Sequence, residues 1–375
     1  MDQAAAWLLD RQRLAADLGA PAQATRLRHK PGLSTVAALE LSGELRWIRV
    51  STPGHADKLQ RSIRTAEAHG ATVVTGAICG TDLHWAHGPA ASDPILLRAA
   101  RPGSSAAGRQ VIERWAGGGL PVLRYNPSRR MVARWAVGST TRNDSDLLVR
   151  LNAAADPEAL RVPAHLAAHG VRILVPTEVH RNGRISFWPW IDGPGDLAGC
   201  DDRQLLQQAG AELARLHRVA GGPGPHHGPD QLAEQRARQL RSLRLVDTEL
   251  AEQAAEVETA VRLVERRHVR VHGDFSADQV LVDAGSRCVV ADLDRSGFGD
   301  PRLDLAGFVA VELIDHGSSR RAEALLEGYG AAADDLRPWI GHALLTRLDQ
   351  PFRAGDPEWR ARTRKVIELA AGVLA

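Results

Sequence analysis

The chain has 375 residues, of which 44% are hydrophobic and 25% are charged. This composition is typical of a folded protein with two or three domains and excludes a disordered chain. The formal net charge is +2, so the global charge does not indicate a partner such as a nucleic acid or an acidic membrane surface.

The N-terminal 20 residues place acidic and arginine side chains within an apolar pattern, which favours an amphipathic helix over a secretory signal. The sequence has no run of about 18 apolar residues that would predict a membrane span. Its three cysteines, Cys79, Cys200 and Cys288, show neither the spacing of metal ligands nor a disulfide framework. We therefore expect a cytoplasmic protein with reduced thiols.

An internal repeat dominates the first half of the chain. Three short segments recur in the same order roughly 100 residues later: 27–31 at 123–127, 47–50 at 148–151, and 68–70 at 168–170. Each copy predicts three strands followed by a helix. We interpret the two copies as a duplicated β-rich lobe, with residues 75–120 as a Gly/Pro/Ser-rich connection that contains a helix around 108–115.

The second half is predicted to be mostly helical after a strand that begins at Ile185. A helix over 201–219 has Asp201 or Asp202 as its cap, and one or two helices follow over 231–268. His226 and His227 lie in a Gly/Pro loop and are read as surface residues, because no third metal ligand lies at a suitable spacing. Short strands are expected at 269–272, 279–283 and 287–292, and helices from 301 onward.

Two acids and an amide are predicted to meet at one edge of a short antiparallel pair. His272, Gly273 and Asp274 follow an apolar strand, Gln279 precedes the next strand, and Asp292 ends the third. Phosphoryl transfer needs a carboxylate that accepts the proton of the attacking hydroxyl and oxygen ligands that hold Mg²⁺ against the phosphates. The spacing therefore favours phosphotransferase chemistry.

The segments HGDFSADQVLV and VVADLDRSGFGDPRLDLAGF, within residues 272–308, resemble the signature of the aminoglycoside phosphotransferase/choline kinase family, which has a protein-kinase-like fold. The resemblance implies that Asp274 is the catalytic base, that His272 structures the catalytic loop, and that Asp292 and Gln279 are metal ligands. It also implies ATP and Mg²⁺ as cofactors. Asp300 and Asp304 are expected to brace the loop and cap the next helix.

Two positions depart from the family pattern. The amide ligand is usually asparagine, whereas Gln279 is one methylene longer and offers the same carbonyl oxygen. The family also places a lysine on the third strand of the N-lobe, where this chain has Arg150. Arginine supplies the charge but is a larger group, and Arg150 is alternatively a solvent-facing residue of a half-buried strand.

Four more residues are candidates for nucleotide binding. Glu158 is a candidate helix partner for Arg150. Ser128 and Arg129 lie in the turn that corresponds to the phosphate-covering turn of the family, although arginine-rich turns are often simply solvated. Trp190 lies where the hinge between lobes is expected, where an aromatic ring either stacks on adenine or belongs to the core.

The fold class expected from these features is α+β, with a β-rich N-lobe and a helical C-lobe of the protein-kinase-like type. The extra β-rich lobe at the N-terminus looks like a duplicated N-lobe. We expect the boundaries 1–120 for this cap and its linker, 121–192 for the N-lobe, and 193–375 for the C-lobe with the catalytic loop.

Three functions remain open from the sequence. The first is ATP-dependent phosphorylation of a hydroxyl on a small molecule, such as an aminoglycoside-like compound, a sugar or an amino alcohol. A cationic acceptor would need acidic side chains, and the C-terminal helices offer Glu312, Asp315, Glu323 and Glu327. The second is a kinase for Ser/Thr of a peptide precursor. The third is a catalytically silent pseudokinase or binding module, which the missing lysine and Gln279 suggest.

Overall fold

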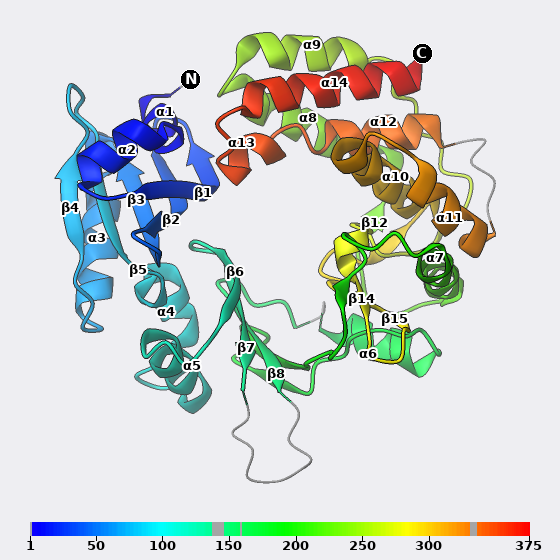
Figure 1. The fold of residues 1–375 in the computed structure, drawn as a ribbon, viewed down its shortest axis with the longest axis horizontal. Coiled ribbons are helices and arrows are strands. Elements are labelled where there is room, and N and C mark those ends of the chain that lie inside the picture. The colour runs from blue at the N-terminus through cyan, green and yellow to red at the C-terminus, as the bar shows by residue number, and fades with distance from the viewer. Residues whose placement is uncertain (1, 137–145, 158–159, 331–335) are drawn as a thin grey trace. The chain divides into compact units, whose positions relative to one another are not determined.

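The structure is a computed structural model that describes residues 2–136, 146–157, 160–330 and 336–375. Its contacts divide the chain into two compact units (Figure 1). The first comprises Met1–Asp156, Thr177–Trp190 and Gln350–Arg360, and the second comprises Pro157–Pro176, Ile191–Asp349 and Ala361–Ala375. Neither unit is a single continuous segment.

The first unit begins with two short helices and an antiparallel five-stranded sheet in the order β1-β2-β3-β5-β4. Its elements are α1 (Gln3–Leu9), α2 (Arg11–Leu18), β1 (Ala22–Lys30), β2 (Ser34–Leu41), β3 (Glu44–Ser51), η1 (Pro53–His55), α3 (Ala56–Glu67), β4 (Val74–Ala77) and β5 (His84–Pro89). The break between α1 and α2 falls at Asp10, whose carboxylate accepts the N–H of Arg13 and so starts the second helix.

A second antiparallel sheet repeats this order as β6-β7-β8-β10-β9. Its strands are β6 (Val122–Asn126), β7 (Arg130–Trp135), β8 (Leu147–Asn152), β9 (Glu178–His180) and β10 (Ile185–Pro189). Helix α6 (Arg161–Ala168), which belongs to the second unit, occupies the place of α3 in the chain. The identical order of strands confirms the repeat that the sequence predicted.

Local geometry follows the repeat down to single residues. Gly70 and Gly170, which follow the equivalent helices, both have left-handed backbones with φ of 78° and 79°. The rings of His69 and His169 both bond through Nδ1 to the carbonyl oxygen four residues earlier, at 2.9 and 2.8 Å. Both helices thus end in the same way.

The two sheets share one hydrophobic core. Buried residues from both sheets and from the helices between them form a continuous cluster that includes Trp47, Ile63, Trp115, Met131 and Phe187. The helices between the sheets are η2 (Ala90–Ser92), α4 (Pro94–Ala100) and α5 (Ala106–Ala116). The predicted connection over 75–120 is therefore wrong in its first part, which contains β5 and most of β4, while its predicted helix lies within α5.

The sequence pattern missed these strands for a physical reason. Strand β4 is short and mostly exposed, and its partner β5 (HWAHGP) carries Gly88 and Pro89 in place of alternating β-branched residues. Gly88 packs closely in the core, since a Cβ there would lie 3.1 Å from the indole nitrogen of Trp47. Packing in the shared core, and not local propensity, makes this segment a strand.

The second unit is mainly helical. Besides α6, its helices are α7 (Arg203–Arg218), α8 (Pro229–Arg244), α9 (Thr248–Glu258), η3 (Ala277–Gln279), α10 (Arg302–His316), α11 (Arg320–Tyr329), α12 (Arg337–Leu345) and most of α14 (Trp359–Leu374), while α13 (Gln350–Ala354) belongs to the first unit. Its two three-stranded sheets are β11 (Gly195–Asp196), β14 (Val280–Val282), β15 (Cys288–Val290), and β12 (His226–His227), β16 (Gly297–Gly299), β13 (Val269–Val271).

Helices α7 and α11 approach each other closely because glycine lies at both contact points. A Cβ on Gly210 would lie 2.0 Å from the carbonyl oxygen of Leu325, and a Cβ on Gly328 would lie 2.0 Å from that of Gln207. Each glycine therefore faces the backbone of the other helix.

Two predictions for this unit need correction. The helical pattern predicted through residue 268 ends at Glu258, and residues 261–268 are irregular. His226 and His227 are not in a loop, since they form β12 and pair in parallel with β16. The predicted strands near 269–272, 279–283 and 287–292 are confirmed as β13, β14 and β15, and Asp202 caps α7 through the N–H groups of Gln204 and Leu205.

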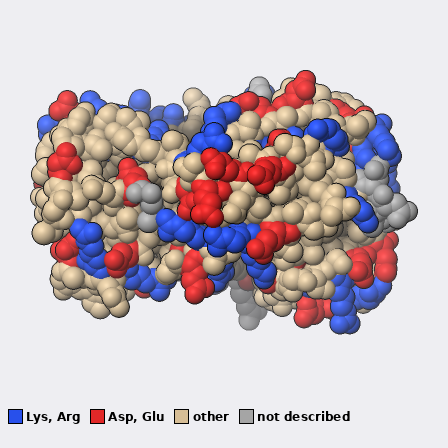
Figure 2. All heavy atoms as spheres, turned by 90° about the horizontal axis from the view of Figure 1, so that it is seen from above, with Lys and Arg blue, Asp and Glu red and all other residues tan. Residues whose placement is uncertain are grey.

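Charged side chains of both signs lie on the face drawn in Figure 2, in accord with the small net charge. The three cysteines are free. Within the described parts of the chain, no helix is both long and apolar enough to cross a membrane.

Candidate active site

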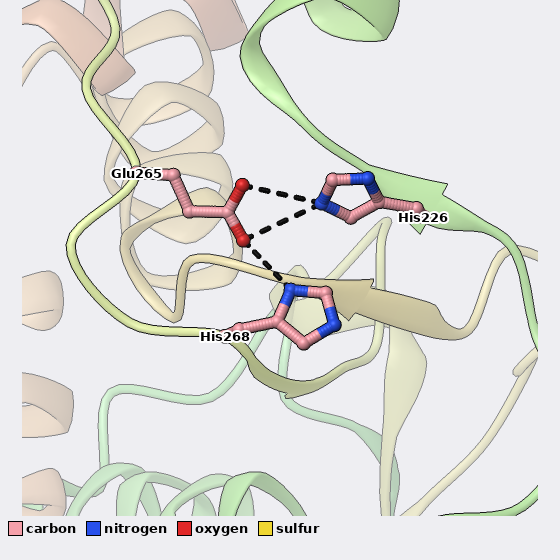
Figure 3. A group of neighbouring side chains, drawn as sticks. All are labelled: His226, Glu265 and His268. Atoms are coloured by element: carbon pink, nitrogen blue, oxygen red, sulfur yellow. Dashed lines mark hydrogen bonds and ion pairs between the residues drawn. The ribbon is translucent and has the colours of Figure 1, made fainter.

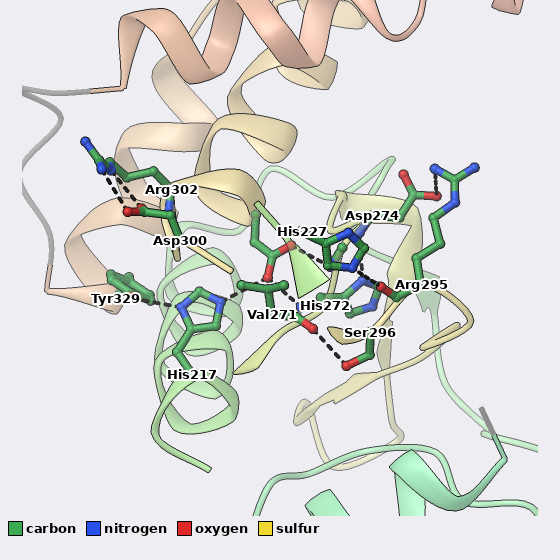
Figure 4. Close-up of polar contacts among 12 residues, drawn as sticks. His217, His227, Val271, His272, Asp274, Arg295, Ser296, Asp300, Arg302 and Tyr329 are labelled. Carbon is green, nitrogen blue, oxygen red and sulfur yellow. Dashed lines mark hydrogen bonds and ion pairs between the residues drawn. The ribbon is translucent and has the colours of Figure 1, made fainter. Parts of the chain in front are cut away.

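The loop that carries Asp274 leaves strand β13 beside the segment of Arg295 and Ser296. Figure 4 shows Arg295 paired with Asp274 and Ser296 bonded to Val271 at the end of β13. His272 is fully buried, and its ring atom Nε2 lies 2.8 Å from the carbonyl oxygen of Ala291. Because a carbonyl oxygen only accepts, Nε2 carries the proton and Nδ1 accepts the N–H of Asp274 at 3.3 Å. One imidazole thus fixes the distance between the two acidic segments.

Glycine is required between His272 and Asp274. Gly273 has a left-handed backbone with φ of 82°, and a Cβ there would lie 2.3 Å from the carbonyl oxygen of Arg295. Any other residue would push apart the two chain segments that form the site.

Asp304, in the first turn of α10, also holds this loop in place. Its carboxylate accepts the N–H of His272 at 2.6 Å and that of Gly273 at 2.8 Å. It also bonds to Nε2 of His217 on α7 at 2.9 Å, while Nδ1 of His217 lies 2.9 Å from the hydroxyl of Tyr329. Burial opposes the ionisation of Asp304, yet these hydrogen bonds and the nearby imidazoles keep its pKa below the ordinary value.

Two arginines flank the carboxylate of Asp274. The Oδ2 atom lies 3.2 Å from a guanidinium nitrogen of Arg295, and Oδ1 lies 3.8 Å from one of Arg347. The side chain of Arg347 is 11% exposed and that of Arg295 is 54% exposed. Burial lowers the pKa of Arg347, while the charge of Asp274 partly compensates. The carboxylate of Asp274 is itself 43% exposed, so it remains open to a substrate.

Gln279 and Asp292 are neighbours across the β14–β15 pair. The N–H of Ala291 donates to the carbonyl oxygen of Gln279 at 2.9 Å, which places the two candidate metal ligands at the same end of the strands. The side-chain nitrogen of Gln279 donates to Asp278 at 2.8 Å, so its oxygen is the atom that it offers to a cation. An amide oxygen and a carboxylate suit the preference of Mg²⁺ for oxygen ligands.

The backbone of Asp292 is left-handed, with φ of 56°. This conformation is uncommon for a residue other than glycine and costs roughly 1–3 kcal/mol. The next residue, Leu293, packs in a small core with Val162 and Leu166 of α6 and Leu216 of α7. The anchored Leu293 holds Asp292 in this orientation.

Four other candidate residues belong to the first unit: Ser128, Arg129, Arg150 and Trp190. Ser128 has a left-handed backbone with φ of 58°, and its N–H donates to buried Asp93 at 2.6 Å. Arg129 is exposed in the same turn. On β8, half-buried Arg150 donates from Nε to Asn152 at 3.3 Å. Glu158 lies outside the described residues.

Trp190 ends the segment Thr177–Trp190 of the first unit. Its ring lies under the guanidinium of Arg134, 4.6 Å from the ring centroid. It is half-buried, so one part of the indole is covered by a cation and not by the hydrophobic core.

Sequence reasoning did not single out three residues around the loop of Asp274, nor Asp93, which holds the turn of Ser128 in the first unit. Arg295 lies inside the recognised motif and could have been found there. Asp93 precedes a proline and a helix, which is a capping signal, but its bond to Ser128 has no local signature. His217 and Arg347 lie far away in the sequence, and only the fold brings them to the loop.

Solved structures confirm the predicted fold. Choline kinase LicA from Streptococcus pneumoniae is 11% identical with a TM-score of 0.51, over 70% of this chain and 99% of that chain. A thermostable mutant of the aminoglycoside phosphotransferase APH(4)-Ia is 18% identical with a TM-score of 0.52, over 68% and 95%. The AMP complex of LicA gives a TM-score of 0.50 at 12% identity, over 68% and 91%. No curated protein matches the sequence.

The sequence profile of the Phosphotransferase enzyme family matches residues 131–339, which is more than half of the chain. The match begins at β7 and includes every residue of the Asp274 and Asp292 segments, while the first sheet lies outside it. With the motif, its geometry and this match in agreement, the chain belongs to the phosphotransferase enzyme family.

Proposed function

We propose that this phosphotransferase moves the γ-phosphoryl group of ATP to a hydroxyl group of a small molecule. The observation that carries the proposal is the 2.8 Å bond from His272 to Ala291, which fixes the loop of Asp274 against the strand that ends at Asp292. The AMP bound to LicA supports a nucleotide donor. The choline kinase and the aminoglycoside phosphotransferase support a small-molecule acceptor.

In this proposal Asp274 accepts the proton of the acceptor hydroxyl while that oxygen bonds to the γ-phosphorus. The bond from this phosphorus to the bridging oxygen breaks, and ADP leaves with the electron pair. Gln279 and Asp292 would hold Mg²⁺, which neutralises charge on the phosphates when bound. The partly exposed carboxylate of Asp274 has the access to solvent and substrate that a general base needs.

Arg150 is proposed as the phosphate contact that replaces the family's lysine, with Trp190 as the aromatic neighbour of the base. Ser128 and Arg129 remain proposed contacts of the phosphate-covering turn. Because Asp93 already accepts the N–H of Ser128, we expect Ser128 to contribute through its hydroxyl.

The charged side chains of the second unit do not favour a cationic acceptor over a neutral or anionic one. Glu312 is buried and faces Arg321 at 3.5 Å, and Glu327 pairs with Arg203. These two acids are therefore engaged with arginines and not reserved for a substrate. Since arginines also flank Asp274, an acceptor screen should include neutral and anionic alcohols beside aminoglycosides, sugars and amino alcohols.

The decisive variant is Asp274→Asn, which keeps the size of the side chain but cannot accept the hydroxyl proton. We expect ADP production with Mg-ATP and an active acceptor to fall by roughly 10²–10⁴-fold. Asp230→Asn, an exposed acid at the start of α8, is the matched control and should keep full activity. Unchanged turnover in Asp274→Asn would rule out this mechanism.

Two other outcomes discriminate the remaining functions. Turnover with Ser/Thr peptides but with no small alcohol would identify a kinase of peptide precursors. Thermal stabilisation by Mg-ATP without product from any acceptor would identify a catalytically silent binding module. The free thiols support a reduced compartment, and we propose the cytoplasm.

A further inference from the structure

Two histidines and one glutamate of the second unit converge at a place that the phosphotransfer chemistry does not use (Figure 3). The carboxylate of Glu265 lies 3.2 Å from Nε2 of His226 and 2.8 Å from Nδ1 of His268. One ligand atom from each residue lies within 4.8 Å of the others. Figure 3 shows both rings turned toward the carboxylate from different chain segments.

The register of the small sheet brings the two imidazoles together. His226 on β12 and Arg270 on β13 both pair with Phe298 on the central strand β16. Side chains two residues apart share a face of a strand, so His268 lies on the face of Arg270 and Phe298. The ring of His268 indeed stacks on Phe298, with centroids 5.7 Å apart, and lies 4.9 Å from the ring of His226.

Glu265 is held in place by its backbone neighbours. Buried Asp300 accepts the N–H groups of Arg266 at 2.8 Å and Arg267 at 3.3 Å. The guanidinium of Arg302 donates to the carbonyl oxygen of Val264 at 2.7 Å and to Asp300 at 2.8 Å. The irregular segment is thus fixed on both sides of Glu265.

We propose that His226, Glu265 and His268 bind a divalent transition metal ion, with Zn²⁺ as the best match. Two imidazole nitrogens and a carboxylate, with water in the fourth position, form a known Zn²⁺ ligand set. With metal–ligand bonds of about 2.0–2.1 Å, neighbouring ligand atoms in a tetrahedron lie about 3.3 Å apart, which is close to the spacing around Glu265. Mg²⁺ prefers oxygen ligands, so this site is chemically distinct from Gln279 and Asp292.

The bound ion would join two separate segments of the unit. It would connect β12, which carries His226, to the irregular segment 261–268, which carries Glu265 and His268 and leads through β13 into His272. We expect the ion to stabilise the small sheet of β12, β16 and β13, from which the loop of Asp274 emerges. The ion itself would take no direct part in the reaction. The inference therefore stands or falls independently of the proposed kinase activity.

The test is calorimetric titration of the full-length, chelator-treated protein with Zn²⁺. We expect saturable binding of one equivalent, and hydrogen exchange should slow in 261–268 and β12. Replacing one ligand, as in His226→Ala, Glu265→Gln or His268→Ala, should weaken binding by at least the roughly 10–100-fold that is typical for loss of an outer-shell partner. Co²⁺ should give the absorption bands of a tetrahedral site in the parent protein, and these should vanish in the variants.

His180→Ala is the matched control. His180, whose side chain is 40% exposed, also pairs with a glutamate, Glu178, at 3.1 Å, but it lies in the first unit. This variant should bind Zn²⁺ as tightly as the parent protein. Melting temperatures measured in chelator will show that the variants are folded, and the isosteric Glu265→Gln change is the mildest of them. Absence of saturable binding to the parent protein would overturn the proposal. Binding that is as tight in all three ligand variants as in the parent protein would overturn it too.

Discussion

At the scale of single residues, the catalytic loop depends on one buried carboxylate. Asp304 receives two backbone N–H groups, from His272 and Gly273, and a ring nitrogen of His217. A backbone N–H without an acceptor is costly when buried. The position of Asp274 is therefore determined by a residue that lies 30 positions further along the chain.

Asp304→Asn should distinguish the role of Asp304, which positions the loop, from the proposed role of Asp274 as the general base. The amide keeps the size but removes the negative charge and one acceptor atom, so the free energy of unfolding should fall by about 1.5–3 kcal/mol. Turnover should fall as well, while Mg-ATP binding is largely kept. Urea unfolding and ADP release measure the two effects. Glu252→Gln, an exposed acid on α9, should change neither, and an unaltered Asp304→Asn protein would contradict the role assigned to this carboxylate.

The sequence was informative at this scale wherever the motif is local. It placed Asp274, Gln279 and Asp292 at the ends of β13, β14 and β15, and the structure confirms these strands. It did not reveal His217 or Arg347, because their contribution comes from helices packed against the loop. Their roles arise from tertiary contacts that leave no short-range spacing.

At the scale of elements, backbone contacts override local propensity. Residues 259–268 have the composition of a helix, but Asp300 and Arg302 hydrogen-bond to the backbone of 264–267 and hold it in an irregular path. A helix there would need the same N–H groups for its own bonds. The same contacts place Glu265 beside His226, so the failed helix prediction marks the candidate metal site.

The α7–α11 contact gives a prediction at this scale. Gly210→Ala or Gly328→Ala would press a methyl group onto the backbone of the facing helix, 2.0 Å from a carbonyl oxygen. We expect a loss of about 1–3 kcal/mol or more in the free energy of unfolding, measured by urea denaturation.

Gly372→Ala is the matched control for the two glycine variants. Gly372 lies in α14 with no neighbour within 4 Å of an added Cβ, and its φ is not in the left-handed region. Alanine should be neutral or stabilise by up to about 1 kcal/mol there. Equal effects at all three glycines would mean that the close approach of α7 and α11 does not limit stability.

At the scale of the whole molecule, two histidines link stability to pH. Burial, with Arg236 and Arg347 nearby, lowers the pKa of His342 to about 3. A guanidinium N–H of Arg236 donates a hydrogen bond to Nδ1 of His342 at 3.1 Å, which the neutral ring can accept. Burial and Arg46 lower the pKa of His87 to about 4.

Acidification should therefore destabilise the protein. An unfolded chain titrates these rings near 6.5, so between pH 6.5 and about 3–4 it binds protons that the folded protein does not. The free energy of unfolding should be at its full value above pH 6.5 and fall as the pH falls, with His342 contributing at most about 1.4 kcal/mol per pH unit. Urea midpoints between pH 7.5 and 4.5 measure this slope.

His342→Gln is the corresponding variant, because its amide oxygen can still accept from Arg236 and does not titrate. The dependence on pH should become shallower, whatever the change in absolute stability. The exposed residue His84 provides the control as His84→Gln, for which the parent slope is expected. An unchanged slope in His342→Gln would show that this ring does not govern acid sensitivity.

The contact between Asp93 and the second repeat also has an evolutionary consequence. Asp93 caps α4 of the first repeat, and it accepts the hydroxyl of Tyr125 and the N–H of Ser128 from the second. Once the two copies share these bonds, deletion of one copy would leave buried polar groups of the other without partners. It would also expose the other copy's part of the shared core. Purifying selection on the catalytic copy would therefore also preserve the first copy, even if the first copy performs no chemistry.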